Sequence, residues 1–271
     1  VLSNLGDLYS EMGQFKRAEE RYLEALKIAE ESFEHHSPKI APILNDLGVL
    51  YSDLGIYDLA DKYYKQSLEI RNETHGELNL YSVVVLNNLG TLYHELADFQ
   101  KAEEYFLAAN TIVQQLDETI SPGTAMISNN LGNLYSDLGD YKSSRELYER
   151  SAEIYLELFG EINYDYAMVL NNLSSLFIEM EQYGLSLEYS KRAAEIYKKV
   201  FGETHPEYAN CIINIGVAYS FQGNYQLAEN NYLEASDILL SAFGSVHPLY
   251  AQNLCRLGMV NYKKKDFLKA E

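Results

Sequence analysis

Tryptophan is absent from this 271-residue sequence, and cysteine is scarce, with only Cys211 and Cys255. Two cysteines without close spacing fit neither the disulfide framework of a small secreted domain nor a structural zinc site. We therefore expect reduced cysteines and a cytoplasmic location.

The sequence also lacks the short motifs that indicate catalytic or cofactor chemistry. It contains no glycine-rich phosphate loop, no nucleophile elbow and no H-E-x-x-H metal motif. His94, His205 and His247 do not have the spacing of metal ligands, and we expect the last two to serve at loop boundaries. These absences predict a chain that is not an enzyme and that has no cofactor and no metal site.

Positive charge is scarce as well, because 21 Lys and Arg residues stand against 40 Asp and Glu, for a formal net charge of −19. Nucleic acids and anionic membranes are bound through clustered Lys and Arg. No apolar run approaches the roughly 18 residues of a membrane-spanning helix. We therefore expect a soluble protein with no nucleic-acid or membrane partner.

What the sequence does contain is one pattern that recurs every 42 residues. The strings LSNLGDLYSEMGQF, LNDLGVLYSDLGIY and LNNLGTLYHELADF begin at Leu2, Leu44 and Leu86, and four further copies keep the spacing without a gap. The copies are 1–42, 43–84, 85–126, 127–168, 169–210, 211–252 and a partial copy at 253–271. Because the chain begins and stops inside apolar periodic runs, we expect it to be a segment of a longer protein.

Each copy contains two helix patterns joined by a short turn. In the third copy, Leu86, Leu89 and Leu92 lie on one face of the first pattern, and Phe106 and Ala109 lie on one face of the second. A single helix pair cannot cover its own apolar face, so each copy must bury it against its neighbours. The pattern predicts an all-α array of stacked helix pairs.

Glycine and proline mark the expected helix ends. The turn between the two helices has Gly13, Gly55, Gly139 and Gly223, where a positive φ costs glycine little. The second helices should stop at Gly160, Gly202 and Gly244. We expect the next first helix to begin at Pro38, Pro122, Pro206 and Pro248.

The fifth copy departs most from the pattern. It has Ser174 and Glu181 where other copies have glycine, Ser186 in place of alanine, and Ser190 in place of an aromatic residue. We therefore predict the weakest packing between repeats at this copy.

The combination of L-x-N-L-G-x-L-Y, G-x-Y/F-x-x-A and G-x-x-H-P resembles the 42-residue tetratricopeptide repeats (TPRs) of kinesin light chains. This resemblance implies that residues 1–271 form a single right-handed α-α superhelical solenoid. It also implies a concave groove, lined by the first helices, that holds a peptide or a helix. Similar arrays serve as sensor or scaffold arms of NTPase or protease-like proteins.

Carried onto this sequence, the family's groove positions form a ladder of amides. The residue before the leucine of N-L-G is Asn4, Asp46, Asn88, Asn130, Asn172, Asn214 or Arg256. Asparagine is a poor residue for a helix interior, so its recurrence needs a reason. Its amide can pair with the main chain of an extended ligand, or it can tie adjacent helices together. The amides assigned to peptide binding are Asn45, Asn87, Asn88, Asn129, Asn130, Asn133, Asn171, Asn172 and Asn214.

A second ladder is acidic, with Glu11, Asp53, Glu95, Asp137 and Glu179 at equivalent places in five copies. A negative charge in the last turn of a helix opposes the helix dipole at a cost of about 0.3–1 kcal/mol. This repeated cost favours a ligand with basic character, and we assign Glu95, Asp137 and Glu179 to its binding. The alternative is a solvated face of an acidic protein. The acidic cargo peptides typical of kinesin light chains would not suit this groove.

Toward the C-terminal copies the groove becomes apolar. Ile178, Ile213, Val217, Phe221 and Met259 replace polar residues at groove positions. Such a strip can anchor hydrophobic side chains of a partner, or it can be covered by a continuation of the chain.

These patterns predict a protein–protein interaction scaffold that binds a peptide or helix in its groove. The alternative is a structural, self-associating or regulatory sensor arm of a larger protein whose effector domain lies outside this segment. Self-association would then occur through the uncapped ends of the array.

Overall fold

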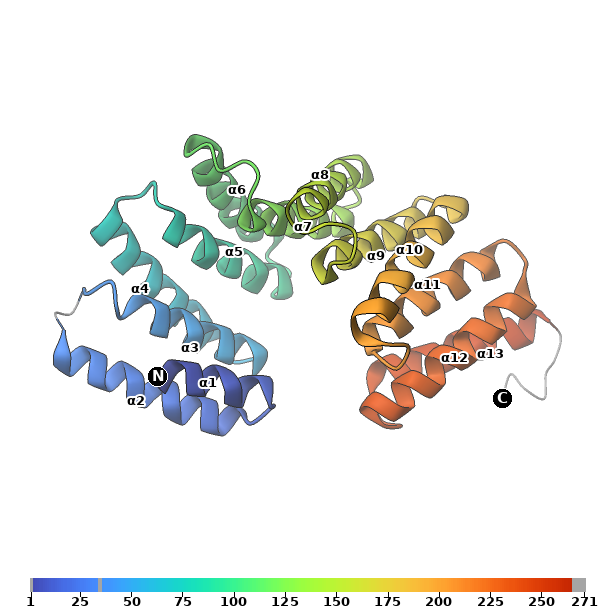
Figure 1. Ribbon diagram of the computed structural model, residues 1–271, viewed down its shortest axis with the longest axis horizontal. Coiled ribbons are helices and arrows are strands. Elements are labelled where there is room, and N and C mark those ends of the chain that lie inside the picture. The colour runs from blue at the N-terminus through green and yellow to red at the C-terminus, as the bar shows by residue number, and fades with distance from the viewer. Residues whose placement is uncertain (1, 34–35, 265–271) are drawn as a thin grey trace. The chain divides into compact units, whose positions relative to one another are not determined.

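The computed structural model describes residues 2–33 and 36–264, and these ranges contain thirteen helices and no strand. The first helices of the pairs are α1 (Leu2–Glu11), α3 (Ala41–Asp53), α5 (Leu80–Glu95), α7 (Pro122–Asp137), α9 (Tyr164–Glu179), α11 (Pro206–Phe221) and α13 (Pro248–Lys263). The second helices are α2 (Phe15–Ser32), α4 (Tyr57–His75), α6 (Phe99–Gln115), α8 (Tyr141–Phe159), α10 (Tyr183–Phe201) and α12 (Tyr225–Phe243). The all-α class predicted from the sequence is confirmed (Figure 1).

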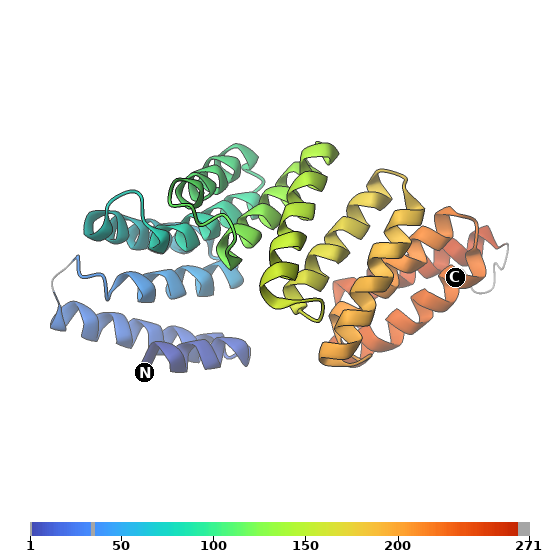
Figure 2. The same cartoon turned by 45° about the horizontal axis from the view of Figure 1, so that its top comes forward.

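The chain divides into two compact units, Val1–Asn130 and Leu131–Glu271, with the division inside α7. Within the second unit, α10 packs on both α9 and α11, and α9 also contacts α11 directly (Figure 2). Within the first unit, α5 packs on α6 and α3 on α4. In the described ranges, none of the helices combines the length and apolarity that crossing a bilayer requires.

The two helices of a repeat approach closely at one glycine. A Cβ atom added to Gly90 on α5 would lie 2.5 Å from the Phe106 ring on α6, and one added to Gly216 on α11 would lie 2.7 Å from the ring of Tyr232 on α12. Phe106 and Tyr232 are themselves buried. The glycine of N-L-G is therefore the seat for the aromatic ring of the second helix, because any side chain there would collide with it.

The turn between the two helices of a repeat has a left-handed residue in every described copy. Gly13, Gly55, Gly139 and Gly223 have positive φ, as the sequence predicted. In the third and fifth copies, which lack this glycine, Ala97 and Glu181 adopt the same conformation, with φ of 57° and 59°. A residue with a side chain is strained in this region by roughly 1 kcal/mol or more.

The loop-boundary role predicted for two histidines is confirmed as helix capping. The Nδ1 atom of His205 accepts a hydrogen bond from the backbone N–H of Glu207 at 3.2 Å, while Pro206 is the first residue of α11. The imidazole also stacks on Phe201, with 4.3 Å between the ring centroids. His247 repeats this arrangement at the start of α13. These rings join the end of one repeat to the beginning of the next.

Proline begins α7, α11 and α13, as predicted, but it does not begin α3. Helix α3 starts at Ala41, and Pro38 lies in the preceding turn, where the backbone N–H of Ile40 donates to the carbonyl of Ser37 at 2.9 Å. The prediction for Pro38 was therefore wrong, because a turn occupies the residues that begin the helix in other copies.

The prediction that packing between repeats is weakest at the fifth copy is also wrong. Ser174 replaces the glycine of N-L-G, and Ser190 replaces the aromatic residue that packs on that glycine in other copies. The larger side chain at position 174 is therefore matched by a smaller one at position 190. The Oγ atoms of Ser174 and Ser186 lie 3.0 Å apart, and Ser190 Oγ donates to the Ser186 carbonyl at 2.6 Å. All three serines are fully buried, and α10 contacts α11 more extensively than α2 contacts α3.

Candidate functional site

The amide ladder lies on the first helices, and its described members bond to one another. The bonds run from Asn88 Nδ2 to Asn45 Oδ1 at 3.1 Å, from Asn130 Nδ2 to Asn87 Oδ1 at 2.9 Å, and from Asn214 Nδ2 to Asn171 Oδ1 at 2.9 Å. In each bond, the residue before the leucine donates to the residue two before the leucine of the preceding copy. For these pairs, the structure confirms the interpretation that amides tie adjacent helices together.

This bonding changes which amides a ligand could reach. Asn87 and Asn129 are each only 3% exposed, so we withdraw their assignment to the ligand surface. Asn88, Asn130 and Asn214 are half-buried. Asn88 and Asn130 each donate one hydrogen bond to the neighbouring helix, and Asn214 donates to both Asn171 and Ser175 on α9. An amide has two N–H donors and a carbonyl acceptor, so bonding to a neighbouring helix does not prevent contact with a ligand.

Four of the predicted residues line one pocket in the second unit, which we name the α7–α9 pocket. It has a volume of about 450 Å³ and contains Asn133, Asp137, Asn172 and Glu179. The rest of its wall consists of Ser136, Tyr141, Tyr148, Ser175 and Leu176. Two carboxylates, two amides and two aromatic side chains therefore share one cavity.

Hydrogen bonding fixes part of this wall. Tyr148 is buried, and its hydroxyl donates to Asn133 Oδ1 at 2.6 Å. Burial raises the pKa of the Tyr148 phenol, so it remains a neutral donor. The Asn133 oxygen is thus turned toward the protein.

An adjoining pocket of about 470 Å³, the α9–α11 pocket, contains much of the predicted apolar strip. Ile178, Val217 and Phe221 line it. The remaining lining residues are Ser175, Glu179, Glu181, Tyr183, Asn214 and Arg256. Of the other two strip residues, Ile213 is buried, and Met259 is exposed but does not line the pocket. The two pockets share Ser175 and Glu179, which makes them neighbours along the first helices.

The acidic ladder occupies a single structural position. Glu11, Asp53, Glu95, Asp137 and Glu179 are the last residues of α1, α3, α5, α7 and α9. In the first unit, loss of hydration on partial burial raises the pKa of Asp53 and of Glu95. These carboxylates therefore lie where negative charge is unfavourable, as the sequence pattern indicated.

Asp46 replaces asparagine in the amide ladder of the second copy. Burial, followed by the negative charge of Asp7, raises the pKa of Asp46 to about 6, while a hydrogen bond from Asn45 and the charge of Arg71 oppose the shift. The first unit thus has a carboxyl group with a pKa of about 6 at a position of the amide ladder.

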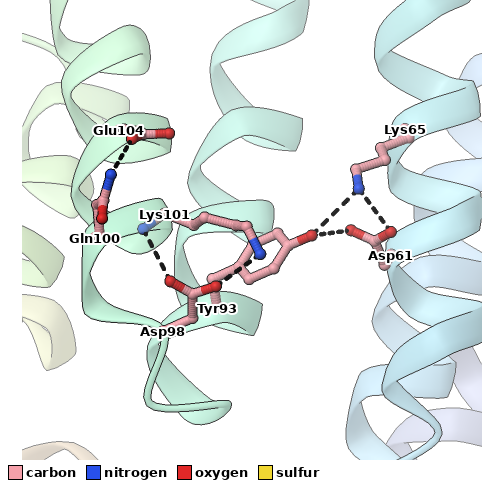
Figure 3. A network of polar contacts seen from close by, with 7 residues as sticks. All are labelled: Asp61, Lys65, Tyr93, Asp98, Gln100, Lys101 and Glu104. Carbon is pink, nitrogen blue, oxygen red and sulfur yellow. Dashed lines mark hydrogen bonds and ion pairs between the residues drawn. The ribbon is translucent and has the colours of Figure 1, made fainter.

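The sequence reasoning missed a network that ties neighbouring repeats through tyrosine hydroxyls (Figure 3). Tyr93 on α5 donates to Asp61 on α4 at 2.8 Å, and Lys65 donates to both of these residues. One copy earlier, Tyr51 donates to Glu19 at 2.7 Å. The regular spacing of a carboxylate ahead of each of these tyrosines is the signal that could have revealed it.

The fold is shared with solved structures of low sequence identity. BtubC (BKLC) from P. vanneervenii is 23% identical, with a TM-score of 0.72 over 88% of this chain and 93% of that one. The nearly identical TPR-like repeats of a candidate kinesin light chain from Podospora anserina are 18% identical, with a TM-score of 0.64 over 79% and 100%. The STAND protein PH0952 from Pyrococcus horikoshii, which has a TPR sensor, is 16% identical, with a TM-score of 0.73. In that case the match covers 99% of this chain but only 40% of the other.

The sequence itself matches a family profile described as tetratricopeptide repeat. The matched stretches are residues 1–73, 40–115, 81–157, 123–197 and 165–241. No curated protein matches the sequence significantly. Because the profile extends over most of the chain in overlapping stretches, the chain belongs to the tetratricopeptide repeat family.

Proposed function

We propose that this chain holds a segment of a partner protein, with basic character, in the groove that the α7–α9 and α9–α11 pockets form in the second unit. The tetratricopeptide fold typically mediates protein–protein interaction, and this proposal adds the surface and the charge of the ligand. The observation that carries it is the pairing of Asp137 and Glu179 in one pocket with Tyr141 and Tyr148.

Charge supports the basic character of the partner. Asp137 and Glu179 end their helices, where the helix dipole already contributes negative potential. Within the described residues, Glu179 has no ion-pair partner, so its charge is available to a ligand. The net charge of −19 adds long-range attraction, which raises the association rate of a cationic ligand and weakens with salt.

Selection of peptides from a phage-displayed library of random dodecamers tests this proposal. We expect the wild-type protein to enrich sequences with Lys or Arg, and we expect Asp137→Asn combined with Glu179→Gln to lose most of that binding. Glu188→Gln, which removes an exposed charge on α10, is the control. Enriched peptides that bind the double variant as tightly as the wild type would contradict the proposed groove.

A second candidate function is an arm that associates with another domain or with a second copy. Leu254 and Met259 on α13 are exposed apolar side chains, and the P. horikoshii protein shows a similar array beside other domains. Light scattering over a concentration series distinguishes this function. We expect self-association that Met259→Asp abolishes, and a monomer at every concentration would exclude association between copies.

A further inference from the structure

The two pockets have different chemistry, and this difference specifies the partner further. We propose that they read two nearby side chains of one extended segment, a Lys or Arg in the α7–α9 pocket and a Phe, Tyr or large aliphatic residue in the α9–α11 pocket. This inference rests on the proposed function and adds the order of side-chain types that the groove selects.

The α7–α9 pocket suits a long cationic side chain. Asp137 and Glu179 provide the carboxylates, and the ring of Tyr141 offers a face that attracts a cation. The half-buried Tyr141 ring also provides an apolar surface for the methylene stem, which Lys and Arg bury while their charged ends stay solvated. A neutral or acidic side chain would not complement the negative charge of this pocket.

The α9–α11 pocket suits an apolar side chain instead. Phe221 occupies the position that is acidic in the five preceding copies, and it is 58% exposed. Its ring stacks on Tyr183, with 4.9 Å between the centroids and 3° between the planes, so the aromatic surface is held in place at the pocket. Ile178 and Val217 extend this apolar surface. A ligand side chain that covers exposed apolar surface of this kind contributes favourable free energy to binding.

Arg256 makes the two pockets differ further in charge. It lines the α9–α11 pocket at the ladder position that is asparagine in the four preceding copies. Its guanidinium offsets one of the two carboxylates, Glu179 and Glu181, that line the same pocket, so this pocket attracts a basic residue less strongly than the α7–α9 pocket does. The basic residue of the partner segment is therefore favoured in the α7–α9 pocket.

The spacing of the pockets fits a short stretch of extended chain. Neighbouring helices pack about 8–10 Å apart. An extended chain advances about 3.3 Å per residue in a strand, or about 3.1 Å in a polyproline II helix. Two side chains with two residues between them lie about 9–10 Å apart along such a chain and span the distance between the adjoining pockets, whereas one intervening residue gives about 6–7 Å.

Titration with defined peptides tests this reading. The probes are capped decapeptides of Gly, Ser and Gln that contain one Lys and one Phe, in either order, with one or two residues between them. The controls replace Lys by Glu, Phe by Ala, or Phe by a second Lys. Binding is followed by chemical-shift changes of the backbone amides of the whole chain, which detect millimolar affinities and locate the contact.

We expect at least one Lys/Phe peptide to bind at least about tenfold more tightly than each control, with shifts at Ser175, Glu179 and Val217. Asp137→Asn should reduce the preference for Lys over Glu, because only Glu179 then remains to bind the cation, and should keep the preference for Phe over Ala. Phe221→Ala should remove the preference for Phe over Ala and keep the preference for Lys over Glu. Leu233→Ala, an exposed apolar residue on α12, should change neither preference.

Three other outcomes would contradict part or all of these proposals. If every Lys peptide binds alike and Asp137→Asn weakens all of them, the two-residue reading fails while the proposed basic partner stands. If no peptide binds more tightly than the Glu control, both proposals fail. If Phe221→Ala leaves the preference for Phe unchanged, the apolar residue is not read by the α9–α11 pocket.

Discussion

At the scale of single residues, Asp46 makes the stability of the first unit depend on pH. Its pKa is raised from 3.8 to about 6, chiefly by burial, so the folded chain binds a proton more tightly than the unfolded chain. The stabilisation from this proton is complete below about pH 4 and is lost as pH rises through about 6. Above that pH, the buried carboxylate lowers the free energy of unfolding.

Asp46→Asn should remove this dependence, because an amide is neutral at every pH. We expect the free energy of unfolding to rise by about 2 kcal/mol at pH 7.5 and to change little at pH 4. Urea denaturation at both pH values measures it, with Asp237→Asn on the exposed surface of α12 as the control. Equal effects of Asp46→Asn at the two pH values would contradict the raised pKa.

The serine pair of the fifth copy offers a second test at this scale. Ser190→Tyr alone should place a ring against the Ser174 side chain and destabilise the fold by about 1–3 kcal/mol, as overpacking does. Adding Ser174→Gly recreates the glycine seat of the other copies and should recover at least about 1 kcal/mol. Thermal unfolding of the two single variants and the double variant measures the coupling. Strictly additive effects would show that positions 174 and 190 are independent.

At the scale of elements, the carboxylates of the acidic ladder lower helix stability and, in the proposed function, favour the binding of basic peptides. Glu179 ends α9, where its charge opposes the helix dipole. Glu179→Gln should therefore raise the free energy of unfolding by about 0.3–1 kcal/mol while weakening the binding of basic peptides. Glu188→Gln lies inside α10, away from a helix end, and should do neither. A loss of stability in Glu179→Gln would mean that the carboxylate has a structural role.

The 42-residue period was sufficient to predict most elements, but only part of the site. Helix pairs, turn glycines and the acidic helix ends follow from features within one copy. The burial of Asn87 and the bond from Asn130 depend on how two copies pack, which the sequence of one copy does not contain. Ala97 and Glu181 are left-handed because the neighbouring helices impose the turn, against the preference of either residue.

At the scale of the whole molecule, the division into two compact units predicts that damage stays local. Gly90→Ala forces a methyl group against Phe106 and should destabilise α5 and α6 by about 2 kcal/mol. Because repeats contact mainly their neighbours, the amides of α10 to α12 should keep their hydrogen-exchange protection.

Hydrogen exchange with mass spectrometry measures both regions in one experiment. Gly184→Ala is the matched control, because its added methyl group meets no atom within 4 Å and helical alanine is favoured over glycine by about 1 kcal/mol. Its effect should be a gain in protection confined to the second unit. Loss of protection throughout the chain in Gly90→Ala would show that the units unfold together.

The described amide bonds also bear on how such an array can change its length. Each joins the same two positions of consecutive copies, so whole copies are interchangeable at these junctions. Deleting residues 88–129, one full period, would join Asn130 directly to Asn87. Asn130 would then occupy the place of Asn88 and would donate to Asn45 instead of to Asn87. Duplication or loss of a period in the gene would thus preserve the amide pairing of the junction. The number of repeats in the array is therefore free to evolve separately from the chemistry that joins them.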